Sequence, residues 1–302
     1  MGPRPGQKTV LITGCTPGGI GHALALEFHA KGLHVIATAR RTEVLTEMAE
    51  MGMSTVALDV TKADSIKACH EEVAKITGGK LNILVNNAGR THTIPATDID
   101  MDDVRETFET NVFGVMAMCQ AFADQLIAAR GLIVNIASLA AVSPYVFGSV
   151  YCASKGAVAS FSRTLRAELR PFGVGVLVAM AGTVKSNIAS HAHRRLPPGS
   201  LYERVGDAFE RRLTYSQQSA SMGTAEYAER LVGRALAAEA PVSALRAWFW
   251  RPDWFWCGGM ASLVWLGHTL GEWVMDEVVY RMFGLYKLEV ILKQEAAQKK
   301  LE

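Results

Sequence analysis

Cysteine is scarce in this sequence and follows no pattern. The five cysteines among 302 residues are scattered, and no pair has the spacing of metal ligands (Cys15, Cys69, Cys119, Cys152 and Cys257). An odd and scattered set argues against a disulfide framework, so we expect reduced thiols in an intracellular compartment and no metal site.

The chain also lacks a large excess of either positive or negative charge. The formal net charge is +2, and no run of basic residues is interleaved with aromatic ones, so we expect no nucleic-acid partner. The first ten residues, MGPRPGQKTV, lack the apolar core of a signal sequence. The chain does hold 49% hydrophobic residues, enough for a substantial buried core.

Short apolar runs alternate with helical patterns along most of the chain. We predict strands at 8–13, 33–39, 54–58, 81–85, 132–137, 174–179 and 245–250, and helices at 63–77, 102–129 and 150–169. This alternation is typical of a Rossmann-type, doubly wound α/β fold, with a parallel sheet of about seven strands and helices on both faces. We expect residues 1–252 to form this domain and residues 253–302 to form a helical extension.

Glycines lie between the first predicted strand and the helix that follows it, at Gly14, Gly18, Gly19 and Gly21. A strand, a glycine turn and a helix N-terminus together favour phosphate binding, because free N–H groups and the helix dipole attract anionic oxygens. A tight structural turn is the alternative interpretation.

The second predicted strand ends in Ala39, Arg40 and Arg41, where a dinucleotide fold often has an acidic residue for the ribose hydroxyls. Arginines suit a 2′-phosphate, so the sequence predicts NADPH rather than NADH. A solvated basic turn is the alternative.

Polar and small residues follow the next two strands. Asp59 is placed to accept a hydrogen bond from an adenine amino group, and the sequence NNAG ends the fourth strand (Asn86, Asn87, Ala88 and Gly89). Open parallel sheets bind ligands at this edge. The small residues favour close approach of a ribose, whereas structural bracing between strands is an equally plain reading of the asparagines.

Tyr151 and Lys155 are four residues apart on a predicted helix, so their side chains share one face. An ammonium group beside a phenol favours the phenolate, which lowers the phenol pKa and allows proton transfer to or from an alcohol oxygen. Ser138 follows the fifth strand, where its hydroxyl can reach the same oxygen. Asn111 lies in mid-helix, and we interpret it as the site of a backbone distortion that frees a carbonyl to hold water.

Together these motifs resemble the short-chain dehydrogenase/reductase family, from about residue 8 to about residue 252. The matching features are TGCTPGGIG at 13–21, Asp59, NNAG at 86–89, Asn111, Ser138, and Tyr151 with Lys155. The resemblance implies a catalytic tetrad. In it Tyr151 is the general acid in reduction, Ser138 polarises the carbonyl, Lys155 holds the nicotinamide ribose, and Asn111 positions a water.

The resemblance also implies the remaining cofactor contacts. Gly182 and Val184 would lie against the carboxamide and Ser186 near the pyrophosphate. The other implied contacts are Gly14, Thr16, Gly19, Ile20, Arg40, Arg41, Asp59, Val60, Asn87, Ala88 and Gly89.

Two departures from the family pattern concern loops at this site. The glycine turn has one residue more than the usual form, and Ala181-Gly182 replaces Pro-Gly, which we expect to loosen the following loop. The GGIG variant, the Ala39-Arg40-Arg41 ending and the C-terminus resemble fungal NADPH-dependent 1-acyldihydroxyacetone-phosphate reductases and related reductases of fungal secondary metabolism.

The last quarter of the chain holds an uncharged stretch of 18 residues, Trp254 to Gly271, with three tryptophans. This length just reaches that of a membrane span, but four glycines and His268 interrupt it. The tryptophans favour a helix at a membrane or lipid surface, such as the endoplasmic reticulum or a lipid droplet, over a true span. Packing as a substrate lid or an oligomer contact is the other interpretation.

The leading functional hypothesis is an NADPH-dependent reductase of a ketone on a hydrophobic substrate. Candidate pocket residues are Tyr145, Phe147, Met180 and Tyr202, and helices 102–129 and 150–169 resemble the family's dimer interface, so a homodimer or homotetramer is expected. A non-catalytic, NADP-binding scaffold at lipid surfaces and an isomerase or cyclase on the same fold are the alternatives.

Overall fold

The structure is a computed structural model that describes residues 2–187, 194–238 and 253–300. Its centre is a seven-stranded sheet in the order β3-β2-β1-β4-β5-β6-β9, in which every neighbouring pair is parallel. The strands are β1 (Thr9–Ile12), β2 (His34–Ala39), β3 (Ser54–Ala57), β4 (Ile83–Asn86), β5 (Leu132–Ile136), β6 (Gly175–Ala181) and β9 (Trp254–Cys257). The predicted doubly wound α/β fold is therefore confirmed.

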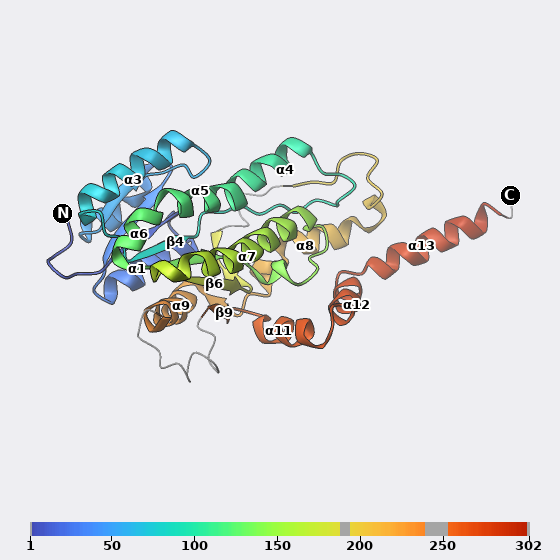
Figure 1. Cartoon of the computed structure of the whole chain (residues 1–302). Coiled ribbons are helices and arrows are strands. Elements are labelled where there is room, and N and C mark those ends of the chain that lie inside the picture. The colour runs from blue at the N-terminus through green and yellow to red at the C-terminus, as the bar shows by residue number, and fades with distance from the viewer. Residues whose placement is uncertain (1, 188–193, 239–252, 301–302) are drawn as a thin grey trace.

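Helices cover both faces of the sheet (Figure 1). The described helices are α1 (Ile20–Ala30), α2 (Thr46–Glu50), α3 (Ala63–Thr77), α4 (Met101–Phe108), α5 (Gly114–Ala121), α6 (Ala123–Ala129), α7 (Ser149–Leu169), α8 (Gly206–Gln218), α9 (Thr224–Ala238), α11 (Ala261–Leu270), α12 (Glu272–Met282) and α13 (Leu285–Gln298). A short pair, β7 (Val184–Lys185) and β8 (Met222–Gly223), lies beside the main sheet.

The strands other than the edge strand β3 supply residues to two hydrophobic cores, because successive side chains point to opposite faces. In β1, Val10 and Ile12 pack with α1 and α9, whereas Leu11 packs with α3 and α5 on the other side. This double burial explains why the strands read as continuous apolar runs rather than as alternating ones.

The helix predicted at 102–129 is interrupted around Asn111. A π-helical turn, Glu109–Phe113, separates α4 from α5, and α6 follows after Phe122. The predicted backbone distortion at Asn111 is therefore present. Such π turns frequently mark functional positions in helices.

The strand predicted at 245–250 lies outside the described residues, and the seventh strand that the structure describes is β9 at Trp254–Cys257. Arg166 of α7 fixes its start, since Nη1 pairs with the Asp253 carboxylate at 2.7 Å and Nε donates to the Val176 carbonyl at 2.8 Å. The sheet thus extends past residue 252, the predicted boundary between the α/β domain and the helical extension. The uncharged stretch 254–271 is divided into a strand, a glycine turn and the helix α11.

The C-terminal helices differ in how far they are buried. Val264 of α11 and Met275 and Val279 of α12 are in the core on the α7 side of the sheet, whereas α13 has no buried residue and extends away from the body (Figure 1). Among the described residues, no single helix is long and apolar enough to cross a membrane. Only the run Met101–Ala121 with Ala123–Ala129, bent by 54°, passes that test by length and composition.

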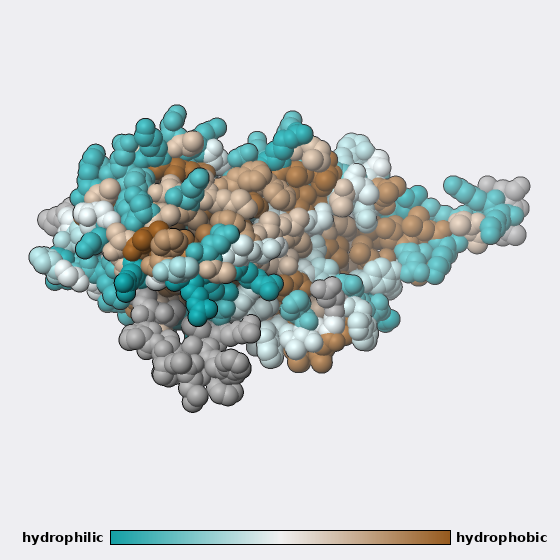
Figure 2. All heavy atoms as spheres, viewed as in Figure 1, coloured by the Kyte–Doolittle hydropathy of each residue, from teal (hydrophilic) through white to brown (hydrophobic). Residues whose placement is uncertain are grey.

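Large apolar side chains remain exposed on α11 and at the start of α12. Leu270 is 67% and Trp273 is 73% exposed. Figure 2 shows brown, apolar side chains over this part of the molecule, at its lower edge.

Candidate active site

The predicted glycine turn joins β1 to α1. Gly14 has φ +74°, and a Cβ there would lie 3.0 Å from the Cα of Ala88, so the turn and the NNAG segment are in close contact. At Gly21 a Cβ would lie 2.4 Å from the Gly14 carbonyl oxygen. The helix begins at Ile20 after Gly19 without a side-chain cap, which leaves first-turn N–H groups available to an anion.

Thr13 and Asn87 hold this turn against β4. The Thr13 hydroxyl accepts from the backbone N–H groups of Asn87 and Ala88 at 2.9 Å each. The Asn87 amide donates to the carbonyls of Thr13 at 2.8 Å and Gly14 at 3.0 Å. The bracing interpretation of Asn87 is therefore correct for its side chain. Thr13, which the sequence reasoning missed, is its partner.

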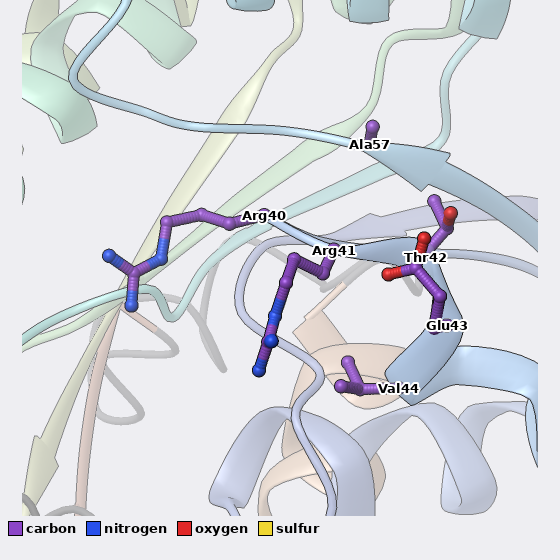
Figure 3. Close-up of a pocket in the computed structure, with 6 residues that line it drawn as sticks. All are labelled: Arg40, Arg41, Thr42, Glu43, Val44 and Ala57. Atoms are coloured by element: carbon purple, nitrogen blue, oxygen red, sulfur yellow. The ribbon is translucent and has the colours of Figure 1, made fainter.

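Two arginines occupy the end of β2, as the sequence placed them. Arg40 and Arg41 are exposed and line an open hollow with Ala57 of β3. Figure 3 shows both guanidinium groups extending outward from the strand end, apart from the Glu43 side chain. The site offers two cations to an anionic group of a ligand.

Asp59 and Val60 follow β3. Burial raises the pKa of Asp59, but hydrogen bonds from the Thr61 N–H and hydroxyl, with the charge of Arg40, outweigh it and hold the pKa below its usual range. Asp59 is thus an ionised acceptor. Val60 is buried, and a Cβ on Gly114 would lie 2.9 Å from its Cγ2, so its side chain packs against α5.

The loop after β6 is tied to the turn after β9. Gly182 donates to the Cys257 carbonyl at 2.7 Å, and Thr183 and Gly259 exchange two backbone hydrogen bonds at 3.1 Å. A Cβ on Gly182 would lie 2.2 Å from the Gly259 oxygen. The expectation that Ala181-Gly182 loosens this loop is therefore wrong up to Ser186, and part of the predicted loop at 189–200 lies outside the described residues.

The four predicted catalytic residues come from three elements at the carboxyl edge of the sheet. Ser138 follows β5, Tyr151 and Lys155 lie one turn apart on α7, and Asn111 is in the π-helical turn. Lys155 Nζ lies 5.8 Å from the centroid of the Tyr151 ring, and the Ser138 side chain is close enough to Tyr151 to lower the pKa of its phenol. A Cβ on Gly89 would lie 3.3 Å from Asn111 Oδ1 and 3.8 Å from Lys155 Nζ, so NNAG reaches the same place.

Asn111 is held by three hydrogen bonds. Its Oδ1 accepts from the Arg90 N–H at 2.8 Å, while its Nδ2 donates to the Arg90 carbonyl at 2.9 Å and to Ser154 Oγ at 3.1 Å. Ser154, which the sequence reasoning missed, donates in turn to the Tyr151 carbonyl at 2.8 Å. The amide therefore joins the segment after NNAG to the catalytic helix.

The electrostatics of Tyr151 and Lys155 differ from the sequence expectation. Burial raises the pKa of Tyr151 above its ordinary value, and the Ser138 side chain opposes this only in part. Lys155 donates to the Ile136 carbonyl at 2.8 Å, and burial lowers its own pKa to about 8. The expected lowering of the Tyr151 pKa is not met, because desolvation is the largest cause of the shift in each group and favours the neutral form of both.

The candidate pocket residues separate into packing and site residues. Met180 is fully buried in the core. Phe147 and Tyr202 form a small apolar cluster with Phe209 of α8, with Phe147 and Tyr202 rings 5.2 Å apart. The Tyr145 ring lies 6.3 Å from that of Tyr151, which places Tyr145 beside the predicted general acid.

The family model described as short chain dehydrogenase matches residues 8–196. The chain belongs to the short-chain dehydrogenase family. This short-chain dehydrogenase is thus an oxidoreductase by family, and the predicted resemblance is confirmed.

Two relatives and two solved structures illustrate the similarity. The short-chain dehydrogenase ptmH of Penicillium ochrochloron is 41% identical over 281 residues, 92% of this chain and 99% of that protein. The NADPH-dependent 1-acyldihydroxyacetone phosphate reductase of Schizosaccharomyces pombe is 45% identical over 201 residues, 65% of this chain and 68% of that protein. The crystal structure of a short-chain dehydrogenase from Streptomyces avermitilis has a TM-score of 0.73 at 26% identity, covering 95% of this chain and 98% of that one. The closed form of serine dehydrogenase, complexed with NADP+, has a TM-score of 0.64 at 28% identity, covering 74% and 88%.

Lys155→Met is expected to stabilise the short-chain dehydrogenase at pH 7. The Lys155 pKa is about 8 against 10.5 for an ordinary lysine, so the unfolded chain binds more protons between these values and stability rises with pH across that window. Below about pH 8, burial of the Lys155 ammonium costs its full ~3 kcal/mol of folding free energy. Loss of the hydrogen bond from Lys155 to the Ile136 carbonyl reduces the stabilisation in Lys155→Met by ~1 kcal/mol.

The measurement is the melting temperature of both proteins from pH 7 to pH 10. The advantage of Lys155→Met should shrink as the pH rises above 8, while Lys75→Met, at a side chain 73% exposed, should change little at any pH. A lower melting temperature for Lys155→Met at pH 7 would contradict the assigned pKa.

Proposed function

We propose that this short-chain dehydrogenase reduces a ketone of a hydrophobic substrate to an alcohol with NADPH. The observation that carries the proposal is the convergence of Asn111, Ser138, Tyr151 and Lys155 at the sheet edge that also holds the glycine turn.

The residues present fit a phosphorylated dinucleotide. Gly14 and Gly21 permit a tight turn in which a Cβ would clash with the Ala88 or Gly14 backbone, and α1 begins without a side-chain cap, while Arg40 and Arg41 lie exposed at the end of β2. The first two features suit a pyrophosphate and the arginines suit a 2′-phosphate. The similar protein from Schizosaccharomyces pombe is an NADPH-dependent reductase by name, and the similar serine dehydrogenase is complexed with NADP+.

Tyr151 and Lys155 suit proton delivery in the direction of reduction. NADPH supplies the hydride to the carbonyl carbon when it is bound. Because burial raises the pKa of Tyr151, its hydroxyl stays protonated near neutral pH and can donate to the carbonyl oxygen, which Ser138 also reaches. Lys155, with a pKa of about 8, can return a proton toward the tyrosine. The products are an alcohol and NADP+, and one proton is taken from water.

Tyr151→Phe tests the proton donor. The change removes the hydroxyl and keeps the ring, so turnover of a reducible ketone should fall about 1000-fold while NADPH binding persists. Initial rates of NADPH oxidation and the quenching of tryptophan fluorescence on NADPH binding measure the two effects. Product analysis with and without NADPH separates reduction from isomerisation, and retained turnover in Tyr151→Phe would refute the proposed role.

Arg40→Ala and Arg41→Ala test the cofactor preference. Each should lower kcat/KM for NADPH by about 10- to 100-fold, the loss expected for a hydrogen bond to a charged group. The value for NADH, which has no 2′-phosphate, is the internal control and should change less than about 3-fold. Equal losses with both cofactors would show that the arginines do not read the phosphate.

We also propose that the exposed face of α11 binds a lipid surface. The helix Ala261–Leu270 has no Asp, Glu, Lys or Arg, and its exposed large apolar side chains, with one from α12, are Leu263, Trp265, Leu266, Leu270 and Trp273. Aromatic and aliphatic side chains of this kind suit the boundary between headgroups and acyl chains (Figure 2).

Flotation with phosphatidylcholine vesicles tests this. The protein should float with the vesicles, and a variant with serine at 263, 265, 266 and 270 should remain in the dense fraction. Leu201→Ser, at another leucine that is 61% exposed, is the control and should still float. Recovery of the unmodified protein in the dense fraction would refute lipid binding by the α11 face.

A further inference from the structure

Arg212 of α8 is a buried cation beside the catalytic tyrosine. Its side chain is only 2% exposed. Its Cζ lies 3.1 Å from the centroid of the Tyr145 ring, whose neighbour at 6.3 Å is the Tyr151 ring. One aromatic ring therefore separates the guanidinium from the general acid.

Aromatic rings hold the guanidinium in place. The ring of Phe283, in the C-terminal segment, lies 5.5 Å from Arg212 Cζ, and Nε donates to the Val146 carbonyl at 3.1 Å. Gly148 supports this arrangement, because a Cβ there would lie 2.9 Å from the Tyr145 ring. The side chain is thus fixed by packing and one backbone bond.

The charge of Arg212 has no counter-charge in the described part of the chain. None of the ion pairs there involves Arg212, and the buried Nη2 has no hydrogen-bond partner. The ionisable groups that act on it are the phenols of Tyr145, Tyr151 and Tyr215 and the thiol of Cys152, and none of these is a carboxylate. Burial of an unpaired cation is costly and is usually retained for a function.

We propose that Arg212 binds an anionic oxygen group of the substrate, a carboxylate or a phosphate, close to the ketone that is reduced. This rests on the proposed reductase function and narrows its substrate class. The apolar part of such a substrate has a suitable neighbour in the cluster of Ile94, Phe147 and Phe209, since Phe209 precedes Arg212 by one helical turn. The substrate is then a keto acid or keto phosphate with a hydrophobic tail.

Paired substrates test the proposal in the unmodified protein. The two pairs are an acyl-dihydroxyacetone phosphate with its dephosphorylated form, and a long-chain keto acid with its methyl ester. We expect kcat/KM to be about 100-fold higher for the anionic member of at least one pair, the size typical of a buried charge pair. The pair that shows the preference distinguishes a phosphate from a carboxylate. Equal values within both pairs would overturn the proposal.

Variants then locate the preference. Arg212→Met should raise KM for the anionic ketone about 100-fold with little change in kcat or in turnover of the neutral ketone, because an interaction common to ground and transition states is lost. Arg212→Lys should restore part of the preference. Arg211→Met, the exposed neighbour on α8, is the matched control and should behave as the unmodified protein. A fall in kcat that is equal for both members would show instead that Arg212 only supports Tyr151.

Two further measurements distinguish an anion site at Arg212 from a structural role of Arg212 and from failure of the reductase proposal. The melting temperature of Arg212→Met should be unchanged or higher, because an unpaired buried charge is removed. A lower one, with parallel losses on both substrates, would indicate a structural role. If no ketone is reduced, the reductase proposal fails, and calorimetric titration with a 1-acylglycerol phosphate still tests Arg212: binding to the unmodified protein that is lost in Arg212→Met supports the anion site, and absence of binding refutes it.

Discussion

The parallel pairing of β4 with β1 and β5 positions the polar groups on which the site depends. Its register sets Val85 beside Ile12 and Asn86 beside Asn135. The Asn86 amide can therefore donate to Asn135 Oδ1 at 2.8 Å, and the residues just beyond the strands meet at one edge. A slip of one residue would reverse the face of every side chain on β4 and leave these amides unpaired in the core. The same hydrogen bonds that stabilise the sheet centre thus fix where the glycine turn and NNAG lie.

The sequence was sufficient for most of the sheet and for bringing the four proposed catalytic residues to one edge of it, because both have strong local signals. Continuous β-branched runs predicted six strands correctly, and Tyr151 and Lys155 needed only helical spacing. The strand predicted at 245–250 lies outside the described residues, and the strand at Trp254–Cys257 was not predicted because it is a short aromatic run inside a longer uncharged stretch. Periodicity alone does not separate a buried strand from a helix in such a run, and its pairing with β6 is a tertiary fact.

Burial was the property of the site that the sequence did not reveal. Tyr151 and Lys155 are adjacent as predicted, yet desolvation, which depends on every layer around them, decides both pKa directions. Arg211 and Arg212 are likewise neighbours of the same type, and only the orientation of α8 makes one exposed and the other buried. Ser154 could have been found from its position one turn after Tyr151, but its hydrogen bond to Asn111 requires the π-helical turn.

The segment after β9 contacts the site at two separate places. Gly258 and Gly259 pack on Gly182 so closely that no side chain fits between them, and Phe283 packs on the guanidinium of Arg212. The first contact fixes the loop expected beside the nicotinamide, and the second fixes the cation beside Tyr151. The two contacts lie on either side of α11 in the chain, so α11 is joined at both ends to segments that pack on the site. If the exposed α11 face binds a lipid surface as proposed, these two packed segments are the connection between that surface and the site.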